Sequence, residues 1–211
     1  MGDYDQLAKQ LMSEAVHEGG IVETEQEVDS ATQTVDVAFF PAEFPGDLRQ
    51  RLRLLGRMAT GRYPRLFEMY HRTPQLRHIR NCRQKQLAWR RGVTNPGFEL
   101  EDKTKIPWLW IVSAGRPVSA LEAYEMVGLG GWPEGVYGAV DALRLRVVVI
   151  SELPKIRDTL LLRLMGRGSV LRQAVSELMA LPEDAFERGL ALPILVKQRL
   201  EIPAPPERTT E

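Results

Sequence analysis

Four apolar segments of strand length, separated by segments of helical periodicity, most narrowly limit what this chain can fold into. The strands are expected at residues 34–41 (TVDVAFFP), 65–71 (RLFEMYH), 106–114 (IPWLWIVSA) and 143–153 (LRLRVVVISEL). A first helix is expected over residues 5–17, where Leu7, Leu11 and Met12 share one face. Strands and helices that mix along one chain predict an α/β (α+β) fold, with a central mixed sheet flanked by helices.

The remaining segments complete this order. Residues 21–28 are polar enough for an edge strand. Two basic helices are expected, one within 46–59 and one over 75–91. A glycine-rich loop is expected at 128–138, and three further helices over 155–166, 168–180 and 183–199. We therefore expect an α/β core over residues 1–153, a helical C-terminal extension over 154–202 packed on that core, and a disordered tail at 203–211.

The charges are unevenly distributed although they cancel over the whole chain. Residues 1–48 hold one Lys or Arg and 11 Asp or Glu, a net charge of −10. Residues 49–91 hold 13 basic residues and one acid, a net charge of +12, and residues 92–211 hold 14 and 16, a net charge of −2. The basic block favours a phosphate-binding surface. The alternative is that its arginines pair with the acidic block in the fold.

Several classes of protein are disfavoured by the composition. Cys82 is the single cysteine, which excludes an intramolecular disulfide and a multi-cysteine zinc site. The three histidines (His17, His71 and His78) lack the spacing of a metal-binding motif. The first ten residues carry acids and lack the apolar stretch of a secretory signal, and no apolar run reaches about 18 residues. We expect a cytoplasmic protein with no membrane partner.

Two carboxylates lie within the expected apolar strands. Asp36 interrupts TVDVAFFP, and Glu68, the one acid of the basic block, interrupts RLFEMYH. A carboxylate in an apolar strand is costly unless its charge is compensated. A buried aspartate can accept a hydrogen bond from a nearby backbone amide, which is one explanation. The other is that both carboxylates point to one side of neighbouring strands and share a divalent cation.

The order helix, three strands, helix, strand over residues 5–114 resembles the core of the PD-(D/E)XK nuclease superfamily. VDVAFF around Asp36 and RLFEMY around Glu68 match its second-strand aspartate and third-strand glutamate. The chain is most similar to bacterial predicted-transposase, recombination-promoting proteins of that superfamily. The strings that strengthen this likeness are LFEMYHRTP, RQKQLAW, ISELPKIRDTLLLRLMG and ALPEDAFERGLALPILVKQRLEI.

The resemblance implies a restriction-endonuclease-like core and metal-dependent hydrolysis of DNA. Its metal, Mg²⁺ or Mn²⁺, would be bound by Asp36, Glu68 and the backbone carbonyl of Met69. An acid on the first helix often assists in the superfamily, and Glu14 in LMSEAV is the matching residue.

One position departs from the superfamily pattern. Tyr70 stands two residues after Glu68, where the superfamily usually has a lysine. Some members move this lysine to the following helix. On a wheel of residues 75–91, Gln86 falls inside the packed face and Lys85 at its edge, so Lys85 would supply the charge and Gln86 a positioning hydrogen bond. Alternatively Lys85 is solvated and Gln86 belongs to the core, and the fold is catalytically inactive.

The basic helix and the aromatic residues bear on the partner. Six arginines could contact the phosphates of DNA: Arg72, Arg77, Arg80, Arg83, Arg90 and Arg91. Tyr63, Trp89 and Trp132 could stack on bases or belong to the core. Leu160, Leu161, Leu164 and Leu171 could complete the core or form a homodimer interface. Three functions stay open: an endonuclease, an inactive nuclease-fold module that binds nucleic acid or a protein, and a purely structural or protein-interaction domain.

Overall fold

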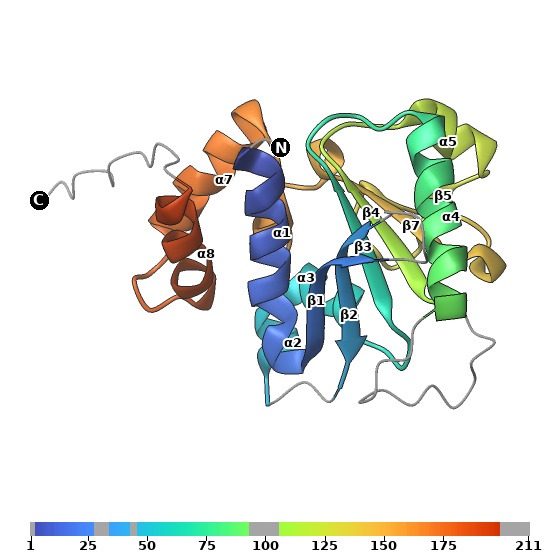
Figure 1. The fold of residues 1–211 in the computed structure, drawn as a ribbon. Helices are drawn as coiled ribbons and strands as arrows, with labels where there is room; N and C mark the ends of the chain where they lie inside the picture. The colour runs from blue at the N-terminus through green and yellow to red at the C-terminus, as the bar shows by residue number, and fades with distance from the viewer. Residues whose placement is uncertain (1–2, 28–33, 43–45, 93–105, 199–211) are drawn as a thin grey trace, which may run out of the picture.

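A mixed seven-stranded sheet forms the centre of the described residues. The computed structural model describes residues 3–27, 34–42, 46–92 and 106–198. The strands follow the order β1-β2-β3-β4-β7-β6-β5 across the sheet (Figure 1). Their bounds are β1 Gly20–Glu27, β2 Thr34–Pro41, β3 Arg65–Tyr70, β4 Trp108–Ser113, β5 Val127–Gly128, β6 Val136–Gly138 and β7 Leu145–Val149. The expected α/β class, with helices on both sides of a mixed sheet, is confirmed.

The pairing of the strands divides the sheet into three parts. β1 and β2 form an antiparallel hairpin, and β2 pairs antiparallel with β3. β3, β4 and β7 run parallel at the centre, where Phe67, Trp110 and Arg146 lie side by side. β7, β6 and β5 are again antiparallel at the far edge. Parallel strands need crossover segments, and the helix between β3 and β4 supplies one of them.

Helices cover both faces of the sheet. The side chains of Phe67 and Met69 point to a core that includes α1 (Asp3–Val16), α3 (Arg53–Ala59), α6 (Leu160–Arg163), α7 (Gly168–Ala180) and α8 (Phe186–Lys197). Leu66, one residue along β3, points to a second core under α4 (Leu76–Gly92) and α5 (Val118–Ala123). Figure 1 shows α1 and α4 on opposite sides of the strands. The alternation of side chains along a strand therefore decides which helices each residue meets.

The C-terminal helices pack on the core through apolar and ionic contacts. The four leucines that could have formed a dimer interface are all buried within this chain: Leu160, Leu161, Leu164 and Leu171. Glu187 of α8 is 1% exposed, and its carboxylate accepts hydrogen bonds from Arg157 at 2.8 and 2.9 Å and from Arg53 at 2.9 Å. These bonds hold the pKa of Glu187 at about 2 despite its burial, so the carboxylate stays ionised and ties α8 to α3.

Several expected boundaries differ from the structure. The glycine-rich segment 128–138 is not simply a loop, because β5 reaches into it and β6 lies within it. Gly135 allows this: its φ is 86°, and a Cβ there would lie 2.9 Å from the carbonyl oxygen of Val149. The expected strand 143–153 shortens to β7, followed by a 3-10 turn over Ile150–Glu152. The expected tail at 203–211 lies outside the described residues.

The helices of the described segments are short or carry charge. None of them is both long enough and apolar enough to cross a lipid bilayer.

Candidate active site

Asp36 lies where β2 and β3 separate. The antiparallel pairing of these strands ends at Val37 and Phe67, so that Asp36 is the first residue of β2 beyond the paired segment. The backbone N–H of Met69 instead donates a hydrogen bond of 2.8 Å to Oδ2 of Asp36. The carboxylate thus satisfies a backbone donor that the diverging strand β2 leaves unpaired. This is the structural explanation that the sequence offered for Asp36, and it leaves the other carboxylate oxygen available.

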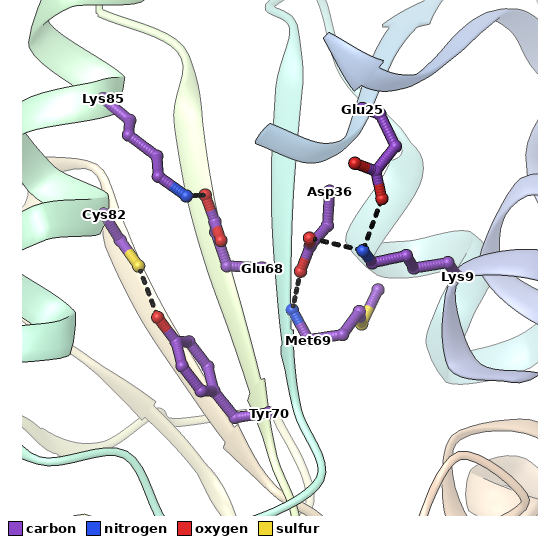
Figure 2. A network of polar contacts seen from close by, with 8 residues as sticks. All are labelled: Lys9, Glu25, Asp36, Glu68, Met69, Tyr70, Cys82 and Lys85. Atoms are coloured by element: carbon purple, nitrogen blue, oxygen red, sulfur yellow. Dashed lines mark hydrogen bonds and ion pairs between the residues drawn. The ribbon is translucent and has the colours of Figure 1, made fainter. Parts of the chain in front are cut away.

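Lys9 of α1 binds that second oxygen. Its Nζ lies 2.9 Å from Oδ1 of Asp36 and 2.7 Å from Oε1 of Glu25 in β1 (Figure 2). The side chains are 6% exposed for Lys9 and 19% for Asp36, so water screens this contact only in part. Glu25 has a φ of 55°, a left-handed conformation that is costly for a residue other than glycine. Backbone strain therefore accompanies the ionic contact.

Glu68 is the second carboxylate of the group. It is 4% exposed and lies on the α4 face of the sheet, where Nζ of Lys85 is 2.9 Å from its Oε1. Burial raises the pKa of Glu68 to about 7; Lys85 opposes this increase and the negative charge of Asp36 adds to it. Burial lowers the pKa of Lys85, but the Glu68 carboxylate outweighs burial and the net shift is upward.

The four charged groups form a line across the diverging strands. Figure 2 shows Lys9, Asp36, Glu68 and Lys85 in this order, with the lysines reaching in from α1 and α4. Two like charges at the centre are thus flanked by two opposite ones. The arrangement can bind a cation between the carboxylates, or hold an anion beside the ammonium groups.

Tyr70 lies next to this group without joining it. Its hydroxyl is 3.1 Å from Sγ of the buried Cys82, and its ring stacks on His78. Burial raises the pKa of the Tyr70 hydroxyl and raises that of the Cys82 thiol to about 12. Both groups are therefore neutral at physiological pH, and Tyr70 supplies no positive charge at the position usual for lysine.

Comparisons of this chain with protein-family models, curated proteins and solved structures found no match.

Lys85 occupies the place that the helical wheel predicted. The contact with Glu68 brings an ammonium group to the carboxylate from the helix that follows β3. Its chemical role stays a prediction.

Gln86 differs from the expectation of a positioning residue beside the carboxylates. It is fully buried, and its Nε2 donates to the carbonyl oxygens of Pro107 at 2.6 Å and Arg144 at 3.2 Å. Its Oε1 accepts a hydrogen bond from Arg83. These partners lie where β4 and β7 begin, so Gln86 fixes α4 to the sheet. The core role that the sequence left open is the one that the structure supports.

The two further expected metal ligands are placed differently from Asp36 and Glu68. Glu14 is exposed and borders a hollow against α8, together with Leu190 and Lys197. Lys9, and not Glu14, is the α1 residue that reaches Asp36. Met69 meets Asp36 through its backbone nitrogen, and its carbonyl remains only a predicted ligand. Among the described residues, no three His, Cys, Asp or Glu side chains gather as a metal site.

The six arginines expected to contact phosphates differ in their exposure. Arg72, Arg77 and Arg80 are exposed. Arg83 is half-buried, and its Nη1 donates to the carbonyl oxygen of Leu143 at 2.5 Å, so it serves the fold. The side chains of Arg90 and Arg91 lie outside the described residues. Three of the six expected phosphate contacts are therefore exposed: Arg77 and Arg80 lie on α4, and Arg72 lies in the segment before it.

Pairing between the basic and acidic blocks accounts for part of their charge. Arg51 lies 3.7 Å from Asp47 across the block boundary. Other basic side chains have partners elsewhere: Arg53 binds Glu187, and Arg65 donates to the backbone carbonyls of Met58, Thr60 and Tyr63. The structure thus gives the arginines varied partners, and the opposite charges of the two blocks do not by themselves explain the basic block.

The donor set fits a hard divalent cation. Mg²⁺ binds oxygen ligands and is commonly held by one or two carboxylates together with substrate phosphate oxygens. Asp36 and Glu68 supply two carboxylates on neighbouring strands just past the last pair of β2 and β3. Lys9 and Lys85 already compensate both charges, so a cation would compete with them.

Sequence reasoning missed Lys9 and Glu25. Lys9 is the one basic residue among the first 48 residues, which is the signal that could have identified it. Glu25 carried no such signal, because no local pattern predicts the left-handed φ that this residue adopts within β1.

Proposed function

We propose that this chain is a nuclease-fold protein of the PD-(D/E)XK type that hydrolyses phosphodiester bonds of DNA with a divalent metal. The observation that carries the proposal is the pair Asp36 and Glu68 at the point where β2 and β3 stop pairing, with Nζ of Lys85 at 2.9 Å from Oε1 of Glu68. Two carboxylates and an ammonium group at one place on a sheet are suited to phosphoryl chemistry, in which charge builds up on phosphate oxygens.

Each residue has a defined task in this proposal. A bound Mg²⁺ or Mn²⁺ would supply Lewis-acid polarisation of the phosphate and activation of water. Asp36 and Glu68 would hold the cation, and Glu68 must release its proton first because its pKa is raised to about 7. Lys85 would stabilise the added negative charge on the phosphate. Arg72, Arg77 and Arg80 would contact the backbone of bound DNA.

The second candidate is a catalytically inactive module that binds nucleic acid or a protein partner. The contact between Lys9 and Asp36 favours it, because an ammonium group compensates the carboxylate that would otherwise hold a cation. Tyr70, which carries no charge, favours it as well.

Cleavage of supercoiled plasmid in Mg²⁺ or Mn²⁺ tests the proposal. Asp36→Asn and Glu68→Gln keep the size of the side chain and one acceptor oxygen but remove the charge, and Arg172→Gln on the exposed part of α7 is the control for general effects. We expect nicking by the wild type and the control, and a loss of at least about 100-fold in each carboxamide variant. Nicking that survives both variants would contradict the proposed site. DNA binding without any nicking would favour the inactive module.

A further inference from the structure

Three arginines and three tryptophans form a layered cluster on the face of the sheet opposite Glu68. The arginine–tryptophan cluster consists of Arg57 of α3, Arg144 and Arg146 at the start of β7, Trp108 and Trp110 of β4, and Trp132. Trp108, Trp110 and Trp132 belong to the core under α1 and α3, whereas Glu68 lies under α4. The cluster is therefore separate from the candidate active site.

Arg146 is the centre of this cluster. Its guanidinium carbon lies 4.2 Å from the ring centroid of Trp108 and 5.1 Å from those of Trp110 and Trp132. Within the described part of the chain, the guanidinium has no hydrogen bond or ion pair. The exposed Asp141 is a carboxylate whose charge acts on it from the preceding turn. Three aromatic rings hold the charge in place without neutralising it.

The neighbouring arginines extend the same pattern. Arg57 lies 4.3 Å from the centroid of Trp132 and donates to the carbonyl of Gly131 at 2.7 Å. Arg144 lies 4.2 Å from the ring centroid of Tyr63. Burial lowers the pKa of the adjacent Arg65 to about 10, and the charges of Arg146 and Arg144 add to this shift. The mutual repulsion indicates a concentration of positive charge that an anion would relieve.

A second observation also indicates a missing partner. The indole Nε1 of Trp110 is buried and has no hydrogen-bond acceptor among the described residues. Buried donors without a partner are rare in folded proteins. Trp110 is 1% exposed and its ring contacts Arg146, so this donor belongs to the cluster.

We propose that the arginine–tryptophan cluster binds single-stranded nucleic acid. The arginines have the charge and the fork geometry to contact phosphates, and the half-buried rings of Trp108 and Trp132 offer surfaces on which unpaired bases stack. Duplex DNA offers its phosphates but keeps its bases stacked inside, so it uses only half of these features. The proposal does not require hydrolysis, because the cluster and the carboxylate pair lie on opposite faces of the sheet.

Anisotropy of a fluorescein-labelled oligothymidylate of about 20 nucleotides measures this binding. Arg146→Gln is the test variant, and Arg172→Gln on α7 is the matched control with the same change of charge. We expect Arg146→Gln to weaken binding about tenfold and to reduce the salt dependence by about 0.7 per lost phosphate contact. The control should keep wild-type affinity. Equal affinity of both variants and the wild type would overturn the proposal.

Two further comparisons separate stacking from charge. The single strand should bind at least about fivefold more tightly than a duplex of the same length. This factor corresponds to the stacking of one base. Three of the four tryptophans lie in the cluster, so the single strand should quench intrinsic fluorescence and inorganic polyphosphate should not. Equal quenching by polyphosphate, or tighter binding of the duplex, would contradict base stacking at this cluster.

A second variant keeps the test decisive if the first one does not fold. If circular dichroism shows that Arg146→Gln unfolds, Arg57→Gln at the margin of the cluster replaces it, with the same expected loss of single-strand binding. Mn²⁺ binding of the same variants should equal that of the wild type. The outcome for this cluster is therefore independent of the outcome for Asp36 and Glu68.

Discussion

The carboxylate of Asp36 in β2 accepts the backbone N–H of Met69 in β3 at 2.8 Å, just beyond Val37 and Phe67, the last pair of the two strands. A side chain thereby replaces a strand as the partner of a backbone donor. At this point Lys9 reaches Asp36 from α1 and Lys85 reaches Glu68 from α4.

The raised pKa of Glu68 predicts that the free energy of unfolding depends on pH when no metal is bound. Its pKa is raised from 4.5 to about 7, so the folded state holds a proton that the unfolded state has already lost between these pH values. The stabilisation is full below pH 4.5 and is lost as the pH rises to about 7, a change of about 3 kcal/mol. Urea unfolding in EDTA should show this loss in the wild type relative to Glu68→Gln. A stability difference that does not vary with pH would contradict the raised pKa.

Lys9→Met should tighten metal binding and reduce stability. Without the ammonium group, Mn²⁺ no longer has to compete with Lys9 for Oδ1 of Asp36, and we expect Mn²⁺ affinity to rise about tenfold. Loss of the contacts with Asp36 and Glu25 should lower the free energy of unfolding by about 1–3 kcal/mol. Lys9→Arg, which keeps the charge, is the control. Unchanged Mn²⁺ affinity in Lys9→Met would show that Lys9 and the cation do not compete.

Lys85→Gln should separate binding from chemistry. We expect plasmid nicking to fall about 100- to 1,000-fold, because the charge beside Glu68 is lost, while DNA affinity changes little. Arg80→Gln, an exposed cation of the same helix, should show the reverse: weaker DNA binding and an unchanged rate at saturating DNA. Equal effects of both variants on the rate would remove Lys85 from the chemistry.

Gln86→Ala should act on stability alone. The substitution removes the 2.6 Å donor of the buried Pro107 carbonyl, at a cost of about 1–3 kcal/mol in the free energy of unfolding, whereas the carbonyl of Arg144 keeps the backbone N–H of Leu109. Metal affinity should stay at the wild-type value, because Gln86 contacts neither carboxylate. Urea unfolding and calorimetry measure the two quantities. Loss of metal binding with full stability would restore the positioning role that the sequence suggested.

The sequence was most informative about features that a single strand or helix determines through its own local pattern. The apolar run around Asp36 and the segment around Glu68 are strands, and Lys85, which the helical wheel placed at the edge of the packed face, contacts Glu68. Position on a wheel says which face is packed, but not which atoms it meets. Of the two roles left open for Gln86, only its contacts with the carbonyls of Pro107 and Arg144 could indicate the core role.

Features that depend on tertiary packing were beyond the sequence. The two residues of β5 are too few to show an alternating pattern, and β6 follows a glycine whose left-handed conformation only the fold requires. Lys9 reaches Asp36 because α1 packs across β2 and β3, an arrangement that no local pattern encodes.

Calorimetric titration with Mn²⁺ is the measurement that tests the central claim most directly. Wild type, Asp36→Asn and Glu68→Gln are titrated at a pH above 7, where Glu68 is ionised, with Glu122→Gln on the exposed side of α5 as control. The account predicts saturable Mn²⁺ binding in the wild type and the control that is lost in both carboxamide variants. Absence of binding in the wild type, or binding retained in both variants, would contradict the metal site and leave Asp36 as the acceptor of Met69 and the counter-ion of Lys9.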